Sequence, residues 1–508
     1  MVTLINHPGL KVAYGIQIQT PSPSIGLAYL GGYLKSKGIP YHAIDGCGLG
    51  MDIIRPYKGN KDILIQGLTV GEIVDRIPVD TKIIGLTCLF SQCWSIVNEI
   101  GISIKEKFPS SFIIAGGEHP TATPETVLNS GIFDVVIYGE GEETLHELII
   151  KIKNREEWKN IDGICYLNKN KALIKNNPRN RITNIDNFPY PDWDNWCIEE
   201  YIDCGQVTGI NTGRSIPILG SRGCPYACTF CSNEEMWTRK YIMRSGKSIV
   251  DEMENFINKY NVNGFTFMDS TFIIDRKKTL DYSKELIKRD LKIKYQLPAG
   301  TRCEAFDLEL AQSLDKSGLV NFSFAPESGD EYILDIIQKK IKIDDFIDAV
   351  KVVLKTNMTV GVFFVIGFPE DTIKSLKNSI KLIRNLALIG VHDVTVSKFT
   401  PYPGSPYYHQ IYDLGEIEDD FTNYSKMINF YDIEGKSFCN SLNKKQLTRW
   451  MVWMFFNFYC ISFIVRPWRF LNNVIFLFTK RIENTRYIRF ISEMIFLRKR
   501  WKISSENY

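Results

Sequence analysis

The sequence predicts an α/β protein with two successive parallel sheets and a helical C-terminal region. Short apolar runs alternate with amphipathic stretches in the first part, and the alternation recurs six times in the second. Beyond it the composition turns aromatic and basic. Alternating strands and helices are typical of parallel sheets. We therefore expect a doubly wound domain (1–180), a linker (181–213), a partial (β/α)6 barrel (214–405) and a helical cap (406–508).

The N-terminal elements are short. Each predicted strand is an apolar run, and each predicted helix is an amphipathic stretch between two such runs. Residues 162–176 predict an additional β-hairpin with an Asn-Lys-Asn turn. The strands are Thr3–Asn6, Tyr41–Asp45, Lys82–Thr87, Phe112–Gly116 and Asp134–Tyr138, and the helices cover 24–37, 93–107, 122–129 and 142–153.

Glycine and small polar residues gather where these strands end. Doubly wound sheets bind ligands at the carboxyl ends of their strands. Glycine permits a close backbone approach there, although a tight turn explains any one of these positions taken singly. The residues that we single out are Ser24, Gly26, Gly116, Gly117, Gly139, Glu140 and Gly141.

The linker is rich in proline and aromatic residues between Asn187 and Trp193. Its aromatic side chains are candidates for packing between the two domains. The barrel that follows has six predicted strands, with helices near 247–259, 276–289, 307–316, 343–356 and 372–388. The strands are Ile216–Gly220, Gly264–Met268, Lys294–Leu297, Val320–Ala325, Val360–Ile366 and Asp393–Lys398.

Three of the 12 cysteines, Cys224, Cys228 and Cys231, follow the first barrel strand with the spacing C-x3-C-x2-C. Thiolates are soft ligands that select iron–sulfur clusters or zinc. A zinc site needs a fourth Cys or His nearby, and neither Cys204 nor Cys303 lies at zinc spacing. Three thiols suit a [4Fe–4S] cluster whose fourth iron is open to a ligand that is not protein. Barrel active sites lie at the carboxyl ends of the strands, which is where this loop is placed.

At these residues the chain resembles the radical S-adenosylmethionine (SAM) superfamily, whose motif is C-x3-C-x-aromatic-C, with Phe230 as the aromatic residue. The resemblance implies that SAM binds the open iron through its amino and carboxyl groups. One electron from the cluster then cleaves SAM to methionine and a 5′-deoxyadenosyl radical. That radical abstracts hydrogen from an unactivated carbon of the substrate.

Further features at the ends of the later strands agree with this resemblance. Phe267–Ser270 lies where the family contacts the SAM amino group, Pro326–Gly329 resembles the family's Glu-Ser-Gly, and Ile366–Glu370 resembles its Gly-x-Pro-x-Glu. Each acidic residue taken singly is as well explained as a helix cap. The SAM-binding candidates are Phe230, Asp269, Arg302, Glu327, Ser328, Gly367 and Glu370.

The glycine-rich turns of the first domain resemble the Rossmann-like cobalamin-binding domain that precedes many radical SAM domains. The resemblance implies cobalamin near Gly116 and Gly117, with the other loops lining the corrin. The family's Asp-x-His-x-x-Gly, whose His ligates cobalt, is missing, and the chain reads Asn6–Leu10 instead. His7 is an alternative axial ligand, although a histidine in a loop is more often structural.

The C-terminal region changes character twice. Asp413–Asp432 is acidic and loop-like, and the chain is aromatic and basic from Leu447 onward. The uncharged run Met451–Val465 is shorter than the ~20 residues that span a membrane. We expect a helical cap on the barrel, with a peripheral membrane contact, including the basic segment Tyr487–Trp501, as the alternative.

Composition limits the remaining possibilities. A net charge of +3 gives no signal for nucleic acid. The nine cysteines outside the motif form no disulfide framework, which favours a reducing cytoplasm. We see no signal peptide in the first residues. The predicted location is therefore cytoplasmic, with membrane association as the alternative.

The leading hypothesis is a cobalamin-dependent radical SAM methyltransferase. The resemblance implies a [4Fe–4S] cluster, SAM, cobalamin, a small-molecule substrate, for which we consider an apolar compound, and a reductant such as flavodoxin or ferredoxin. Three alternatives stay open: oxidative cyclisation or rearrangement by the same machinery, as in anaerobic tetrapyrrole cyclases; a radical SAM enzyme without cobalamin; and an iron–sulfur protein without SAM chemistry.

Overall fold

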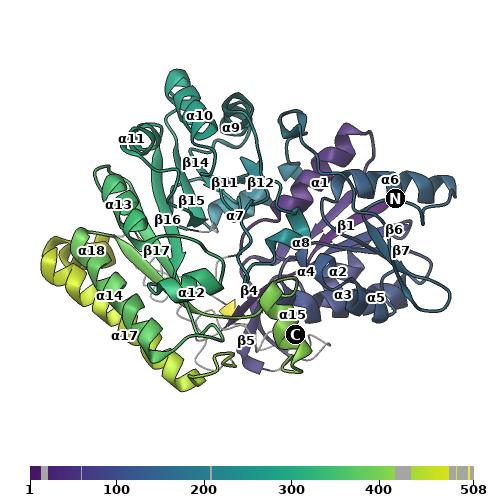
Figure 1. The fold of residues 1–508 in the computed structure, drawn as a ribbon. Helices are drawn as coiled ribbons and strands as arrows, with labels where there is room; N and C mark the ends of the chain where they lie inside the picture. Colours follow the sequence, from purple (N-terminus) through teal and green to yellow (C-terminus); the bar gives the residue numbers. More distant parts are fainter. Residues whose placement is uncertain are drawn as a thin grey trace.

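The computed structural model describes residues 1–12, 21–58, 60–205, 209–417 and 436–479, together with 485, 488, 502 and 503. Two α/β halves lie side by side, and helices of the C-terminal region cover the outer side of the second half (Figure 1). The predicted fold class, a doubly wound domain followed by a partial barrel, is confirmed.

The N-terminal sheet has five parallel strands extended by the predicted hairpin, which runs antiparallel. The parallel order β3-β1-β6-β7-β8 is the 2-1-3-4-5 order of a doubly wound fold. The order reverses between β1 and β6, so a ligand crevice is expected beyond the ends of these two strands. The strands in spatial order are β10 (Leu173–Lys175), β9 (Ile164–Leu167), β8 (Val135–Ile137), β7 (Phe112–Gly116), β6 (Ile83–Thr87), β1 (Val2–Asn6) and β3 (His42–Asp45).

The helices of this half agree with the predictions except at two points, because the short helix Val70–Asp75 was not predicted and the predicted helix 122–129 is interrupted. The predicted helix 122–129 is two short helices that meet at Thr123. Pro124 follows Thr123 and disfavours helical backbone at the residue before it. The helices are α1 (Ile25–Ser36), α2 (Val70–Asp75), α3 (Trp94–Lys107), α4 (Glu118–Ala122), α5 (Pro124–Asn129) and α6 (Glu142–Asn154).

A small second sheet was not predicted. It pairs β2 (Gly9–Val12), β5 (Asn60–Gln66) and β4 (Ile53–Tyr57) antiparallel, and β19 (Lys502–Ile503) is added parallel to β4. Its strands are brought together from distant parts of the chain. No single one of them carries a strong alternating pattern, so sequence reading missed the sheet.

The second half is a sheet of six parallel strands in sequential order, as predicted for a partial barrel. Five of the helices listed below begin at a side chain that accepts a hydrogen bond from the backbone N–H three residues on, namely Ser245, Asp275, Asp307, Asp330 and Thr372. The sixth begins after Lys342 without such a bond. The strands are β11 (Ser215–Ile218), β14 (Gly264–Phe267), β15 (Lys294–Thr301), β16 (Leu319–Glu327), β17 (Thr359–Ile366) and β18 (Asp393–Lys398). The helices are α9 (Gly246–Tyr260), α10 (Arg276–Arg289), α11 (Leu308–Lys316), α12 (Glu331–Ile336), α13 (Ile343–Val353) and α14 (Ile373–Ile389).

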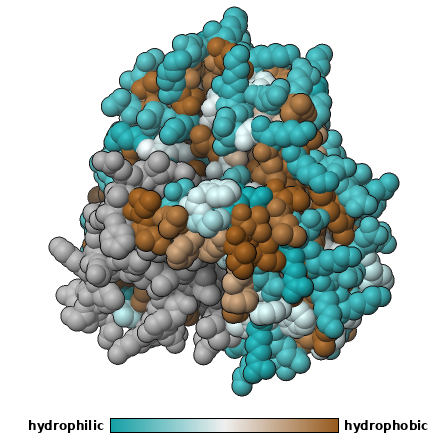
Figure 2. Space-filling view, turned by 90° about the vertical axis from the view of Figure 1, so that its left-hand side faces the viewer, coloured by the Kyte–Doolittle hydropathy of each residue, from teal (hydrophilic) through white to brown (hydrophobic). Residues whose placement is uncertain are grey.

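The C-terminal region contributes α15 (Pro406–Asp413), α17 (Lys444–Val465) and α18 (Pro467–Thr479). α17 is 22 residues long. It is longer than the uncharged run Met451–Val465, because its first turns also include charged residues. Among the described helices, α17 alone has the length and composition to cross a membrane. Viewed from the side of these helices, hydrophobic side chains gather across the middle of the molecule (Figure 2). Apart from Ile488, the segment Tyr487–Trp501 lies outside the described residues, as does most of Asp413–Asp432.

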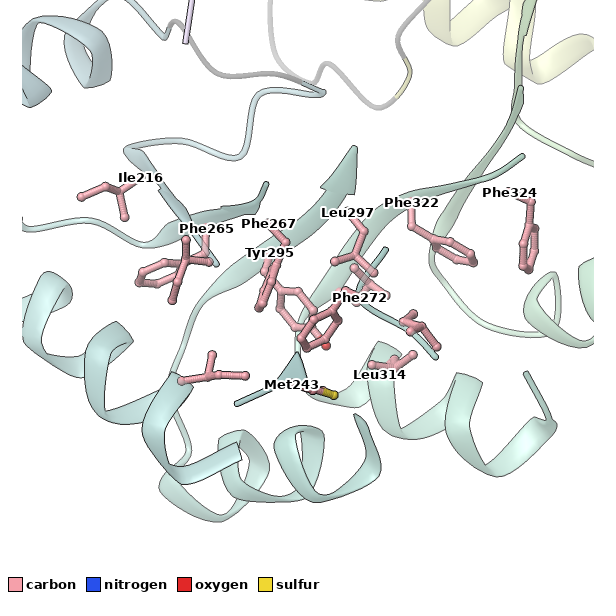
Figure 3. Packing of buried hydrophobic residues seen from close by; sticks show 14 of the residues in the cluster. Ile216, Met243, Phe265, Phe267, Phe272, Tyr295, Leu297, Leu314, Phe322 and Phe324 are labelled. Carbon is pink, nitrogen blue, oxygen red and sulfur yellow. The ribbon is translucent and has the colours of Figure 1, made fainter. Parts of the chain in front are cut away.

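Aromatic side chains fill the layer between the barrel strands and their helices. Phe267, Tyr295, Phe322 and Phe324 point from the strands toward the helices (Figure 3), and all four are fully buried. Because side chains alternate along a strand, their neighbours face the concave side of the sheet. The outer layer therefore stabilises the barrel and leaves the concave side for a ligand.

The linker contains a short helix that was not predicted from its sequence. This helix is α7 (Ile198–Asp203), and Trp193 and Trp196 are fully buried in a cluster shared with both halves. Asp192 accepts hydrogen bonds from Lys35 and Tyr41 of the first half. The linker thus fastens the two halves to each other, which agrees with the interdomain packing that we proposed for its aromatic residues.

Candidate functional site

The cysteine loop lies between β12 (Ser221–Arg222) and α8 (Asn233–Trp237), where the two halves meet. Cys231 is exposed, and Cys224 and Cys228 are half-buried. Burial raises the pKa of the partly buried Cys224 and Cys228 thiols, so a soft metal would have to displace their protons. Among the described residues, no three Cys, His, Asp or Glu side chains are already gathered as a metal site. The donor set is therefore three thiols on one partly exposed loop, which fits a cluster with an open iron better than zinc.

Contacts on several sides fix this loop. The backbone N–H of Thr229 donates to the carbonyl of Ile337 (3.1 Å), and that of Tyr407 donates to the carbonyl of Thr229 (3.0 Å). The Phe230 ring lies 5.7 Å from the Phe368 ring, which belongs to the predicted Gly367–Glu370 element. The loop is thus held by the turn after α12, by the helix Pro406–Asp413 and by the segment after β17.

Asp269 follows β14 and is almost fully buried. Its carboxylate accepts hydrogen bonds from the backbone N–H of Gly220 and from the hydroxyl of Ser221, the residues that lead into the cysteine loop. Burial raises the pKa of Asp269 to about 6. It does not cap a helix, since α10 begins at Asp275. Asp269 therefore supports the base of the loop, and its assignment to the SAM amino group stays a prediction.

Arg302 and Glu327 lie beside the cysteine loop. The Arg302 guanidinium is 3.8 Å from the centre of the Tyr226 ring. Glu327, at the end of β16, accepts a hydrogen bond from the buried ammonium of Lys339 (2.9 Å). Sequence reasoning missed Lys339, because nothing in its sequence surroundings marks it.

Ser328, Gly367 and Glu370 hold the adjoining turns. The hydroxyl of Ser328 accepts from the N–H of Asp330 (3.2 Å). Gly367 has a φ of +87°, which favours glycine, and its N–H donates to Asp371 (2.7 Å). The Glu370 carboxylate accepts from the Tyr407 hydroxyl (2.6 Å). Gly367 and Glu370 join the cysteine loop through Phe368 and Tyr407, whereas Ser328 holds the turn before α12; a SAM contact stays a prediction for each.

The glycine-rich turns of the first half differ in how much space they leave. A Cβ at Gly26 would meet nothing within 4 Å, whereas at Gly117 it would lie 2.6 Å from the carbonyl oxygen of Cys88. Gly116 is nearly as open as Gly26, and Ser24 precedes α1 without a capping hydrogen bond from its side chain. Within the part of the chain that the structure describes, no contact places Ser24 or Gly26 beside the cysteines.

An apolar shelf follows β6 at the point where the strand order reverses. Leu89 and Phe90 are both about half exposed there. Exposed apolar side chains beside open glycine positions fit the flat, largely apolar ring of a corrin. The predicted cobalamin site is therefore chemically suitable, with Leu89 and Phe90 as the residues that sequence reading missed.

Two histidines lie near this shelf. The Nδ1 of His7 is 2.7 Å from the carbonyl of Pro8, and burial lowers its pKa. A proton on Nδ1 would donate to this carbonyl and leave Nε2 with its lone pair. His119 is buried against Trp94, with Nδ1 2.9 Å from the Ser91 hydroxyl. His119 is therefore a structural residue. His7 stays a candidate axial ligand of cobalt only because its Nε2 would keep a lone pair.

The Gly139–Glu142 loop is paired with the second half by charge. The carboxylate of Glu140, which we predicted to line the corrin, accepts from Arg181 (2.7 Å) and Arg222 (2.9 Å), and Arg222 also pairs with Glu142 (2.7 Å). The role of Glu140 at cobalamin stays a prediction. Gly139 faces the carbonyl of Met236 in α8, and Gly141 packs near Leu30. This loop therefore faces the cysteine loop, because Arg222 immediately precedes Gly223 and Cys224.

A second contact joins the halves on the other side of the cysteines. Glu118, directly after Gly117, accepts a hydrogen bond from Ser232, directly after Cys231. The predicted cobalamin loops and the predicted cluster loop thus share one interface. A surface depression of about 460 Å³ beside Ile185, Ser245 and Lys278 contains none of the predicted site residues.

Comparison with known proteins agrees with this arrangement. A model of the B12 binding domain matches residues 12–149, and a model of the radical SAM superfamily matches residues 218–383. An uncharacterized methyltransferase of Pyrococcus horikoshii is 29% identical over 413 residues, with 80% of this chain and 82% of the relative covered. The anaerobic magnesium-protoporphyrin IX monomethyl ester cyclase of Rubrivivax gelatinosus is 26% identical over 424 residues, covering 82% and 71%.

Solved structures share the fold. The radical SAM methyltransferase TsrM of Kitasatospora setae, with cobalamin and a [4Fe–4S] cluster bound, superposes with a TM-score of 0.63 at 17% identity, covering 81% of this chain and 78% of that one. The cobalamin-dependent enzyme OxsB, with aqua-cobalamin and SAM bound, superposes with a TM-score of 0.66 at 16% identity, covering 98% and 75%.

Proposed function

The chain belongs to the cobalamin-dependent radical SAM enzymes, and we propose that it methylates an unactivated carbon of a small, largely apolar substrate. The chain uses a [4Fe–4S] cluster, SAM and cobalamin, and it needs an external reductant. When bound, these cofactors supply hydrogen abstraction and the methyl group that replaces the hydrogen. The observation that carries the proposal is the shared interface of the two predicted cofactor loops, through Glu140 and Arg222.

In this proposal the chain positions and shields the reactants. Cys224, Cys228 and Cys231 are the cluster ligands, and Glu327 and Asp269 would orient SAM. The ion pairs between the halves keep the two cofactor loops together. Holding reacting groups close and away from water is the protein's main contribution to such chemistry.

The concave side of the barrel supports an uncharged substrate. A Cβ at Gly300 would meet Ala325 at 2.4 Å and Phe363 at 3.3 Å, so these residues share the concave face of the sheet. Phe363 and Val365 are only partly buried there. Ser323 lies on the same face, where a Cβ at Gly361 would meet its hydroxyl at 2.6 Å. Apolar side chains with a few polar groups among them are typical of small-molecule sites. For the reductant we propose a small one-electron carrier such as flavodoxin or ferredoxin, which would reach the cluster at the exposed Cys231.

The test is anaerobic reconstitution of the full chain with iron, sulfide and hydroxocobalamin, followed by removal of unbound material. We expect about one corrinoid and about four iron atoms per chain. SAM and a reductant should then yield 5′-deoxyadenosine. Cleavage without retained corrinoid would contradict the cobalamin part, and retained cofactors without cleavage would contradict the radical chemistry.

Oxidative cyclisation is the second candidate function, favoured by the similarity to the cyclase of Rubrivivax gelatinosus. SAM with a deuterated methyl group separates the two. A methyltransferase delivers the label to a small-molecule product, whereas a cyclase forms a product that has lost hydrogen and carries no label. Candidate acceptors and cyclisation precursors should be tested side by side.

We further propose that α17 and α18 contact a membrane surface. The sequence between Glu434 and Glu483 has no acidic residue. Exposed apolar side chains next to basic ones suit an anionic lipid surface. The exposed apolar residues are Val452, Trp453, Phe456, Ile464, Val465, Trp468, Phe470, Leu471 and Ile475; the basic residues of the acid-free stretch are Lys436, Lys444, Lys445, Arg449, Arg466, Arg469, Lys480 and Arg481.

The contacts of α17 favour lying on a membrane over crossing it. Its buried face packs on α14 and β18. Asn457 accepts a hydrogen bond from Arg384 (2.8 Å), and Thr448 accepts one from Lys398 (3.2 Å). Crossing a membrane would break these contacts and uncover the barrel.

We expect the full chain to float with vesicles that contain phosphatidylserine and to bind phosphatidylcholine vesicles more weakly. Trp453→Ser with Phe456→Ser should lower the vesicle-bound fraction about tenfold, since two large apolar side chains no longer insert. Tyr332→Ser, which removes an exposed side chain from α12, is the control. Equal flotation of the variant and the wild type would contradict the proposal, as would dimerisation through this face in light scattering.

A further inference from the structure

The turn after α12 has an unusual backbone. Gln338 and Lys340 both have positive φ angles, +52° and +51°, although neither is glycine. Such residues cost about 1 kcal/mol or more each and persist only where the surrounding structure holds them. Lys339 lies between them, and its N–H donates to the carbonyl of Leu334 (2.9 Å). The backbone on either side of Lys339 is therefore strained.

This backbone directs one lysine inward. Gln338 and Lys340 are exposed, whereas the Lys339 side chain is only 9% exposed. Its ammonium donates to the Glu327 carboxylate (2.9 Å) and lies 6.0 Å from the centre of the Phe230 ring. A buried cation thus lies between a carboxylate and the cysteine loop.

The same turn is bonded to the cysteine loop through its backbone. The carbonyl of Ile337 accepts from the N–H of Thr229 (3.1 Å). The carbonyl of Lys339 accepts from the Arg302 guanidinium (2.6 Å), which in turn stacks on the Tyr226 ring. Since Tyr226 and Thr229 flank Cys228, the position of Lys339 relative to the cysteines is fixed on two sides.

We propose that Lys339 is a positioning residue that sets the reduction potential of the cluster. Reduction adds one electron and breaks no bond, so it adds negative charge beside the three thiolates. A fixed cation in a buried site stabilises that charge and makes reduction by the external donor easier. Glu327 holds the ammonium in place and opposes part of its effect. The inference rests on the proposed function, in which the three cysteines hold the cluster.

The test is a potentiometric titration of the reconstituted full chain without SAM, monitored by electron paramagnetic resonance of the reduced cluster. In Lys339→Met we expect the equilibrium constant for reduction to fall at least about tenfold, which for one electron is about 59 mV toward lower potential. Lys340→Met is the matched control, because this exposed lysine of the same turn should leave the potential unchanged. Glu327→Gln should shift the potential in the opposite direction.

Two more variants separate charge from folding. Lys339→Arg keeps the charge and should retain most of the wild-type potential. Lys339→Met combined with Glu327→Gln leaves no lone buried charge, so this double variant should load a cluster even where Lys339→Met alone does not. Its change in reduction potential should be smaller than that of Lys339→Met alone. A Lys339→Met chain that loads a cluster at the wild-type potential would overturn the inference and leave the proposed function intact. A wild-type chain that binds no cluster would overturn both.

Discussion

Replacing Cys228 with alanine is expected to abolish cluster binding and SAM cleavage. The loop offers three thiols within eight residues of sequence, and the described residues show no other group of three Cys, His, Asp or Glu that could hold a metal. Loss of one ligand leaves two, which cannot retain the [4Fe–4S] cluster that the family requires. After anaerobic reconstitution we expect iron and sulfide at background levels, no visible iron–sulfur absorption and no 5′-deoxyadenosine.

The control for this variant is Cys460→Ala. Cys460 lies in α17 and is partly buried, as Cys228 is, but it is outside the predicted site. It should load the same iron as the wild type and cleave SAM at the same rate. If Cys228→Ala kept wild-type iron and cleavage, the three-cysteine assignment would be wrong.

Replacing Arg222 with methionine is expected to lower the free energy of unfolding by about 3–5 kcal/mol, since it leaves a buried carboxylate without its partner. Arg222 pairs with Glu140 and Glu142, and all three side chains are less than a tenth exposed. Arg181 can still neutralise Glu140, so Glu142 is the carboxylate left unpaired. Urea unfolding of the full chain, followed by tryptophan fluorescence, measures the change.

Two controls test this explanation. Arg222→Met combined with Glu142→Gln removes one charge of each sign and keeps the pair between Arg181 and Glu140, so most of the stability should return. Arg239→Met breaks an ion pair with Glu234 in which both partners are about half exposed. It should cost less than about 1 kcal/mol. A similarly small cost for Arg222→Met would show that the interface between the halves does not depend on this network.

Local patterns in the sequence predicted much of the fold. The strands of both parallel sheets are apolar runs whose neighbours along the chain are also neighbours in the sheet, apart from the reversal at β1. Helix starts are also encoded locally, because a capping side chain such as Asp275 accepts a hydrogen bond from a backbone group only three residues away. The cysteine motif is equally local, since its three thiols lie on one loop.

Tertiary structure decided what depends on residues far apart in the chain. Glu140 and Arg222 are 82 positions apart, and nothing near either residue identifies the other. The small sheet of β2, β4 and β5 and the burial of Trp193 and Trp196 likewise depend on the packing of distant segments.

The sequence by itself determined the order of the two halves, their parallel strands and the loop that carries the three thiols. These features follow from hydrophobic periodicity, capping and close spacing, which act within a few residues. Only the tertiary structure brought Lys339 to the cysteine loop and turned Glu140 toward Arg222. A buried charge is stable only where the fold supplies its partner, and that partner comes from another element of the chain.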